Sequence, residues 1–181
     1  MNAALDFLSR DAVTVARELI GWQLLVTEQD SSKTGGTIIE TEAYNQDDAA
    51  SHSYKGKTPR TEVMFGPAGR IYVYFTYGMH WCMNIVTGQN GRGEAVLIRA
   101  IVPEYNIAIM RARRRNKPDH LLTNGPAKIC QALTITGSDN GQVIGEGKFE
   151  LTPPLKKYKV RVTPRIGIKQ DTHRLWRFIV T

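Results

Sequence analysis

The chain has 181 residues, 41% of them apolar, and carries a formal net charge of +7. This length suits one domain with a sizeable core, so we predict a single domain over residues 1–181. The chain contains no run of about 18 apolar residues that could span a membrane, and its first residues lack the pattern of a secretion signal. The positive charge permits a nucleic-acid partner but does not establish one, because many basic proteins bind none.

The first half of the chain predicts a helix followed by strands. Apolar side chains recur at helical spacing over residues 9–20. Short strands are predicted over residues 22–26 and 36–44, and the polar residues 29–36 predict a loop between them. A polar, charge-rich stretch then runs over residues 45–60.

A hairpin and a further strand are predicted in the middle of the chain. Residues 69–86 form two alternating runs of apolar and aromatic side chains, with a reversal near Tyr77-Gly78. After a turn rich in Gly and Asn, residues 94–101 predict a third strand. Next, residues 103–115 predict a helix that has proline in its first turn and arginines in its last.

The last third of the chain predicts a helix and short strands. A helix opens at Gly125-Pro126, residues 137–147 predict turns, and strands are expected over 158–162 and 175–180. Helices and strands are mixed rather than strictly alternating. We therefore predict an α+β fold, a single mixed domain with a curved, mainly antiparallel sheet, a protruding β-hairpin and flanking helices.

Glu42 is the first residue that suggests chemistry. Side chains alternate across a strand, so Ile38, Glu40, Glu42 and Tyr44 are expected on one face. A strand glutamate is usually a solvated surface charge. Two carboxylates on one face, an aromatic neighbour and the nearby His52 are, however, the parts of a hydrolytic pocket for a flat substrate.

Three tyrosines belong to the predicted hairpin. Tyr72 and Tyr74 share one strand face, where packing and a role in function are both open for Tyr72. Tyr77 lies beside Gly78 at the reversal, where burial is less expected. An aromatic side chain at a protruding tip can push into a base stack, and stacking holds nucleobases without regard to sequence.

Two polar residues occur within apolar strands. Asn84 is flanked by apolar side chains, and a buried hydrogen-bonding role and a substrate-reading role are equally open. Arg99 ends the apolar run Val96-Leu97-Ile98, and a buried arginine normally has an anionic partner.

The remaining polar features have simpler interpretations. The arginine run 111–115 is typical of a solvated helix end. At Gly125, free backbone N–H groups could attract an anion, with Lys128 one turn along, although plain capping explains the same pattern. The two cysteines predict buried reduced thiols, and no pair of His or Cys has zinc spacing. We expect no metal and no cofactor.

Taken together, these segments resemble the alkyladenine (3-methyladenine) DNA glycosylase family. The matching stretches are Glu40-Thr41-Glu42-Ala43-Tyr44, Ala50-Ser51-His52-Ser53, Thr58-Pro59-Arg60, Met64-Phe65, Ile71 to Met79, Cys82-Met83-Asn84-Ile85, Val96 to Ala100, Asn124 to Leu133, Pro164 to Ile168 and Trp176-Arg177-Phe178. They cover most of the chain in order, which is more specific than any single motif. The family's Ser in the Gly-Pro segment is Ala127 here, and two loops differ slightly in length, which bears on substrate preference.

The resemblance implies a monofunctional glycosylase that leaves an abasic site. Glu42 would activate the attacking water as a general base, with Arg99 and the backbone near 166–168 holding that water. Duplex DNA carrying a damaged purine would be the partner, and we expect a monomer. In a bacterium the protein would work in the cytoplasm at the nucleoid, and in a eukaryote in the nucleus.

The resemblance also implies how the damaged base is held. Tyr44 and Tyr74 would sandwich the flipped base, His52 would line the pocket and donate a hydrogen bond, and Tyr72 would support or line it.

The other implied roles concern the guanine filter and the DNA. Asn84 would exclude guanine by a clash with its exocyclic amine. Tyr77 would wedge into the duplex, and Gly125 and Lys128 would meet the DNA backbone.

Two rival hypotheses remain at this point. A sugar O-glycosidase could use Glu40 and Glu42 as its carboxylate pair, but the basic charge and Tyr77 have no part in it. A non-catalytic nucleic-acid binding module could stack bases on the tyrosines, but a carboxylate in its groove would repel phosphate.

Overall fold

The computed structural model describes residues 3–181, and over that part of the chain eight strands form one antiparallel sheet. The strands are β1 (Gln23–Thr27), β2 (Lys33–Tyr44), β3 (Ile71–Thr76), β4 (His80–Val86), β5 (Ala95–Tyr105), β6 (Phe149–Thr152), β7 (Val160–Thr163) and β8 (Arg177–Val180). The helices are α1 (Ala12–Glu18), α2 (Ile107–Arg113) and α3 (Pro126–Ala132), with 3₁₀ turns at Ala3–Ser9, Glu62–Phe65, Asp119–Leu121 and Gly137–Asp139. The predicted α+β class is confirmed.

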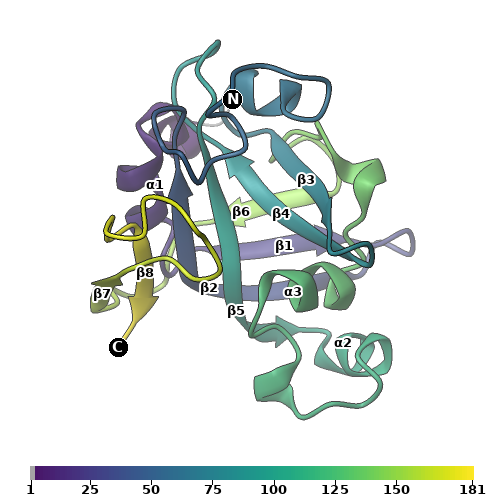
Figure 1. Ribbon diagram of the computed structural model, residues 1–181. Coiled ribbons are helices and arrows are strands. Elements are labelled where there is room, and N and C mark those ends of the chain that lie inside the picture. The colour runs from purple at the N-terminus through teal and green to yellow at the C-terminus, as the bar shows by residue number, and fades with distance from the viewer. Residues whose placement is uncertain (1–2) are drawn as a thin grey trace.

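The long strand β2 organises the sheet. The order is β3-β4-β5-β2-β1-β6, and β8 also pairs with β2 while β7 pairs with β8. One edge of β2 therefore meets β5, whereas the other edge meets first β1 and then β8. The sheet curls around this strand, so that β1 and β6 run across β4 and β5 (Figure 1).

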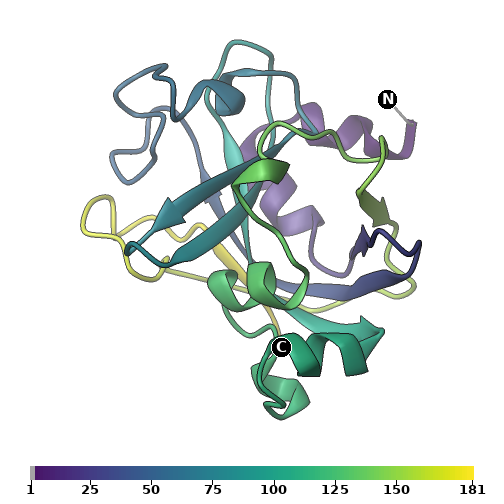
Figure 2. The ribbon, with the colours of Figure 1, turned by 90° about the vertical axis from the view of Figure 1, so that its right-hand side faces the viewer.

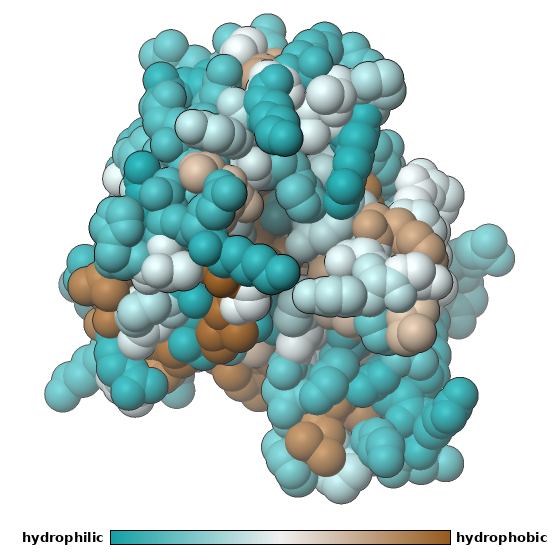
Figure 3. Space-filling view, viewed as in Figure 1, coloured by the Kyte–Doolittle hydropathy of each residue, from teal (hydrophilic) through white to brown (hydrophobic). Residues whose placement is uncertain are grey.

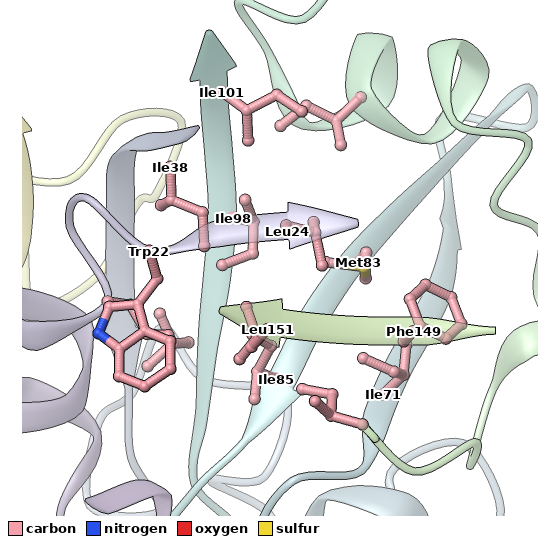
Figure 4. Close-up of a cluster of buried hydrophobic side chains, with 14 of the residues drawn as sticks. Trp22, Leu24, Ile38, Ile71, Met83, Ile85, Ile98, Ile101, Phe149 and Leu151 are labelled. Carbon is pink, nitrogen blue, oxygen red and sulfur yellow. The ribbon is translucent and has the colours of Figure 1, made fainter. Parts of the chain in front are cut away.

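The main core fills the space inside this curl. Figure 4 shows Leu24 and Leu151, from β1 and β6, pointing toward Met83, Ile85 and other apolar side chains of the opposite strands. All of these residues belong to one buried cluster, which the helices α1 and α3 also join. The concave side of the curled sheet is thus occupied by core, and any functional pocket must form elsewhere on the sheet.

Two glycines let the strands cross closely where the sheet turns. A Cβ atom at Gly35 would lie 2.1 Å from the backbone oxygen of Leu24, and one at Gly36 would lie 1.8 Å from that of Val102. Any side chain at these positions would collide with a neighbouring strand. The sequence predicts a loop through this region, but the structure begins β2 at Lys33 because the glycines permit tight pairing rather than a turn.

The β3–β4 hairpin carries an unusual turn. Tyr77 (φ 51) and Gly78 (φ 67) are the central residues of a turn closed by Met79 N–H and Thr76 C=O. Positive φ at both positions is the requirement of a type I′ turn, and it is costly for tyrosine. Tyr77 is 84% exposed, and the hairpin tip extends to the same side as the loop after β2 and the segment 164–176 (Figure 2).

Several local predictions need correction. Pro103 lies in β5, which continues to Tyr105, and the following helix begins only at Ile107. Strand β6 is not among the predicted strands, because four alternating residues after a glycine-rich segment are too short a pattern to distinguish a strand. A bulge in the β2–β5 pairing skips Ile39, so Ile38 lies in the core instead of sharing a face with Glu40.

Neither cysteine forms a disulfide, and both are buried. Among residues 3–181 no helix is long and apolar enough to cross a bilayer.

Candidate active site

A pocket of about 850 Å³ opens on the face of the sheet opposite the core. Its walls come from β3 and β4, from β5, from the loop after β2 and from the segment 164–176. The space-filling view shows this face hollowed near its centre (Figure 3). Its lining includes Tyr44, Ser51, His52, Tyr72, Tyr74, Tyr77, Cys82, Asn84, Leu97, Arg99, Ile166 and Ile168. Seven of the residues predicted from sequence, spread over 56 positions, therefore meet at one hollow.

Glu42 is completely buried behind the residues that line the pocket. The hydroxyl of Tyr44 donates to its Oε2 at 2.8 Å, and Nη1 of Arg99 approaches the same oxygen at 3.3 Å. The backbone N–H of Ile166 donates to Oε1 at 2.8 Å. The side chain of Glu42 is 0% exposed, and all three of its partners line the pocket. Glu42 therefore meets the pocket through these three donors rather than lining it directly.

The carboxylate of Glu42 can accept one hydrogen bond more than it receives from these donors. An ionised carboxylate offers about four lone-pair sites. The Tyr44 hydroxyl, the Arg99 guanidinium and the Ile166 N–H occupy three of them. The one remaining site is able to accept a proton from a further donor, which is what a general base requires.

Arg99 reaches Glu42 because β5 is irregular at this point. The β2–β5 register skips Arg99 between the pairs Glu40–Ala100 and Thr41–Ile98. Such a bulge re-aims a side chain, and Arg99 points away from the core into which Ile98 is packed. Its neighbouring carboxylates raise the pKa of Arg99, against the opposing effect of its burial, so it remains a cation.

A buried ion pair supports Tyr44 from behind. Arg165 pairs with Asp48 through two hydrogen bonds, and both side chains are 0% exposed. The guanidinium lies 4.6 Å from the ring centre of Tyr44 and 5.2 Å from that of Trp176. Burial, with the charge of Glu42 next, raises the pKa of the Tyr44 hydroxyl, so this group is a donor to Glu42. The ring of Tyr44 is thus held from its rear face and from its hydroxyl.

The opposite wall is an aromatic cluster. His52 Nδ1 lies 3.0 Å from the hydroxyl of Tyr72, and its ring meets that of Tyr74 edge-on with centres 4.6 Å apart. Desolvation, helped by the charge of Arg60, lowers the pKa of His52 to about 4. A neutral His52 whose Nδ1 accepts from Tyr72 would carry its proton on Nε2, as a donor.

Asn84 and Tyr77 occupy different depths of the pocket. Asn84 is 4% exposed, and its Nδ2 donates to the backbone oxygen of Tyr72, its cross-strand partner, at 3.1 Å. This bond fixes the amide on the pocket floor. Tyr77 stands at the rim with the neighbouring Met79, which is 69% exposed. The hairpin tip therefore presents two large apolar side chains to solvent.

Gly125 and Lys128 do not line the pocket, although Pro126 between them does. Nζ of Lys128 donates to Oδ1 of Asn124 at 2.8 Å, and no side chain caps the start of α3 at Gly125. Two arginines of the run 111–115 are held in ion pairs. Arg111 pairs with Asp119, and Arg113 pairs with Glu28.

Sequence reasoning missed several residues around the site. Lys55, in the loop after β2, and Lys169, in the segment 164–176, both line the pocket, and no motif in the sequence singled them out. Asp48 and Arg165 are 117 positions apart, so only the fold brings them together. In the sequence, the only sign of this pair is that Arg165, a basic residue, lies inside the matched stretch 164–168. Within residues 3–181 no cluster of three metal-ligating side chains occurs.

Comparison with known proteins supports the same interpretation. The family model of methylpurine-DNA glycosylase (MPG) matches residues 6–181. A protein of Nitrosospira multiformis, named as a candidate 3-methyladenine DNA glycosylase, is 48% identical over 175 residues, covering 97% of this chain and 88% of its own. A protein of Methanoculleus marisnigri with the same name is 43% identical over 183 residues, covering 98% and 94%. Because the match extends over nearly the whole chain, this chain belongs to the methylpurine-DNA glycosylase family.

Proposed function

We propose that this DNA glycosylase flips alkylated or deaminated purines out of duplex DNA and hydrolyses the N-glycosidic bond with a water activated by Glu42. Family membership makes the chain a DNA-repair enzyme, a hydrolase of N-glycosyl bonds. The substrates we propose are 3-methyladenine, 7-methylguanine, hypoxanthine and ethenoadenine. The observation that carries this mechanism is the buried Glu42 carboxylate, held by three donors that all line the aromatic pocket.

The reaction needs a base and an anionic environment at the sugar. The bond breaks through a transition state with positive charge on the anomeric carbon. The charge of Glu42 stabilises that carbon, and its free lone-pair site accepts the proton of the attacking water. Arg99 and the backbone near Ile166 would hold the water in line. An abasic site and the free base are the products.

The aromatic walls suit neutral as well as cationic purines. A tyrosine face attracts a cationic base by on the order of 1 kcal/mol. Here the rear face of Tyr44 already contacts the Arg165 guanidinium, and Arg60 lies 5.7 Å from the ring centre of Tyr74. These two guanidinium groups weaken the attraction that the rings of Tyr44 and Tyr74 can exert on a cationic base. Stacking, together with a hydrogen bond from neutral His52, would then retain neutral lesions such as hypoxanthine.

Base release from lesion-containing duplexes tests the proposed function. With no added metal, folded protein should release hypoxanthine or 3-methyladenine at low salt and leave an intact strand with an alkali-labile abasic site. Release of neither base would overturn the proposal. Because Lys55 and Lys169 line the pocket, borohydride reduction is added to the assay. A covalent protein–DNA adduct would contradict the hydrolytic mechanism and point to a lysine nucleophile.

Substitution of Tyr77 tests the flipping step. Unstacking a nucleotide costs a few kcal/mol, and a side chain that fills the vacated space offsets part of that cost. Tyr77→Ala should weaken binding to a lesion duplex by roughly tenfold, in line with the 1–3 kcal/mol per stacked base, while binding to undamaged duplex changes less. Tyr105→Ala is the control, because this exposed tyrosine lies outside the pocket. Equal effects of the two substitutions would remove the wedge.

Asn84 offers a separate test of base choice. Its amide is fixed by Tyr72 on the pocket floor, where the exocyclic amine of guanine would collide with it. Asn84→Ser shortens the side chain and should increase release of undamaged guanine, measured by mass spectrometry after long incubation. Release of hypoxanthine should change less. A guanine rate equal to that of the unmodified protein would count against this filter.

The contacts of Glu40 weaken the O-glycosidase alternative. One oxygen of its carboxylate accepts from both Arg99 and Arg177, and Glu40 does not line the pocket. A carboxylate held in this way is not positioned as the second member of a catalytic pair.

A further inference from the structure

Glu40 has an elaborate set of contacts without touching the pocket. Its Oε1 accepts a hydrogen bond from Nε of Arg99 at 3.0 Å and another from Nε of Arg177 at 2.6 Å. The three side chains are between 15% and 18% exposed. Two arginines on one largely buried carboxylate form a charge-assisted cluster, which we call the Glu40 cluster.

One branch of the Glu40 cluster controls how Arg99 meets Glu42. Arg99 gives Nε to Glu40 and only Nη1 to Glu42, at 3.3 Å. Arginine and carboxylate frequently pair through two parallel hydrogen bonds. Because Glu40 occupies Nε, Arg99 makes a single contact with Glu42, and the remaining lone-pair site of Glu42 stays open.

The other branch holds the segment that completes the site. Arg177 is the cross-strand partner of Glu42, and its Nη1 donates to Oγ1 of Thr163 at 3.3 Å. Thr163 ends β7 and Arg177 begins β8, so this contact joins the two ends of the segment 164–176. That segment supplies the Ile166 N–H that binds Glu42. Glu40 thus anchors both Arg99 and the base of this segment.

We propose that Glu40 is a positioning residue for base release, holding Arg99 and the segment 164–176 so that Glu42 keeps one lone pair free for water. The inference rests on the proposed function, in which Glu42 is the general base. Glu40 itself needs no contact with the substrate. The charged and titratable groups near Glu42 are Glu40 and Tyr44 on β2, Arg99 on β5, Arg177 on β8, Tyr74 on β3 and Arg165 in the segment 164–176.

The test measures single-turnover release of hypoxanthine across pH with Glu40→Gln. Removing one negative charge beside Glu42 and freeing Arg99 to pair with it both favour ionised Glu42. The acid limb of the rate profile should therefore move to lower pH. Because Arg99 and Ile166 are less well placed, the rate on the neutral plateau should fall by on the order of tenfold or more, with little change in affinity for the lesion duplex.

Two further variants sharpen the result. Arg177→Gln removes a positive charge beside Glu42, so it should also lower the rate but move the acid limb to higher pH. Glu150→Gln is the matched control, because Glu150 is a strand glutamate that pairs with Lys33 and lies outside the pocket. It should leave the plateau rate and the position of the acid limb unchanged.

Several outcomes would overturn the inference. A Glu40→Gln protein that loses rate while its acid limb stays in place has lost only structure, and one with an unaltered profile shows no role for Glu40. If Glu40→Gln does not fold, the test is made with Arg177→Gln. A pH–rate profile of Arg177→Gln equal to that of the unmodified protein would also overturn the inference. Absence of release by the unmodified protein is a different result, because it removes the proposed function itself.

Discussion

Glu42→Gln is expected to reduce base release by about a thousandfold, within the range that general-base catalysis contributes. Glutamine keeps the shape of the side chain and can still accept from the Ile166 N–H, but it cannot take a proton from water. Since Glu42 is buried behind the pocket wall, affinity for a lesion duplex should be nearly unchanged. Single-turnover release and equilibrium binding on the same hypoxanthine duplex separate the two effects.

The matched control is Glu104→Gln. Glu104 is also a strand glutamate with a hydrogen bond, which it accepts from the Thr37 hydroxyl at 2.8 Å, but it lies outside the pocket. It should retain full activity. Substantial release by Glu42→Gln would mean that another group activates the water, while a parallel loss of binding would mean that Glu42 acts in recognition.

Asp48→Asn is expected to lower the free energy of unfolding by about 3–5 kcal/mol, the usual cost of breaking a buried ion pair. The change leaves the fully buried Arg165 guanidinium without its counter-charge. For a chain of this size such a loss corresponds to a fall of roughly 10 °C in Tm. Urea unfolding followed by fluorescence measures it. The stack of Arg165 on Tyr44 should loosen too, so release should slow even where the variant is folded.

The adjacent residue provides an internal comparison for this prediction. Asp47 pairs with Arg92 at the surface, where the carboxylate side chain is 72% exposed. Exposed pairs of this kind contribute about 0–1 kcal/mol. Asp47→Asn should therefore be close to neutral, and an Asp48→Asn protein that is no less stable than it would show that the buried pair is dispensable.

Much of the fold could be predicted from local patterns. The alternation over residues 71–86 and the Tyr77-Gly78 reversal predict the hairpin, because strand periodicity and turn chemistry are properties of neighbouring residues. Element boundaries were predicted less well. Pro103 is tolerated in β5, and Ile38 is turned into the core by a bulge, because pairing with other strands decides both.

Some residues of the candidate site could likewise be predicted from the sequence, and others could not. Glu42, Tyr44 and His52 stand within 11 positions, and their residue types in a strand and its following loop were enough to suggest a pocket. Glu40 could be noticed beside them but not explained. Its partner Arg177 lies 137 positions away, and nothing in either local sequence indicates that the two meet.

The sequence by itself determined that Tyr72 and Tyr74 share one strand face, where the hairpin reverses, and to which family the chain is similar. Only the tertiary structure decided that Glu42 lies behind Tyr44, Arg99 and Ile166, which line the pocket, rather than lining it itself. The same holds for the two buried ion clusters, Asp48 with Arg165 and Glu40 with its arginines. Periodicity depends on adjacent residues, whereas a buried charge depends on every distant residue that the fold places around it.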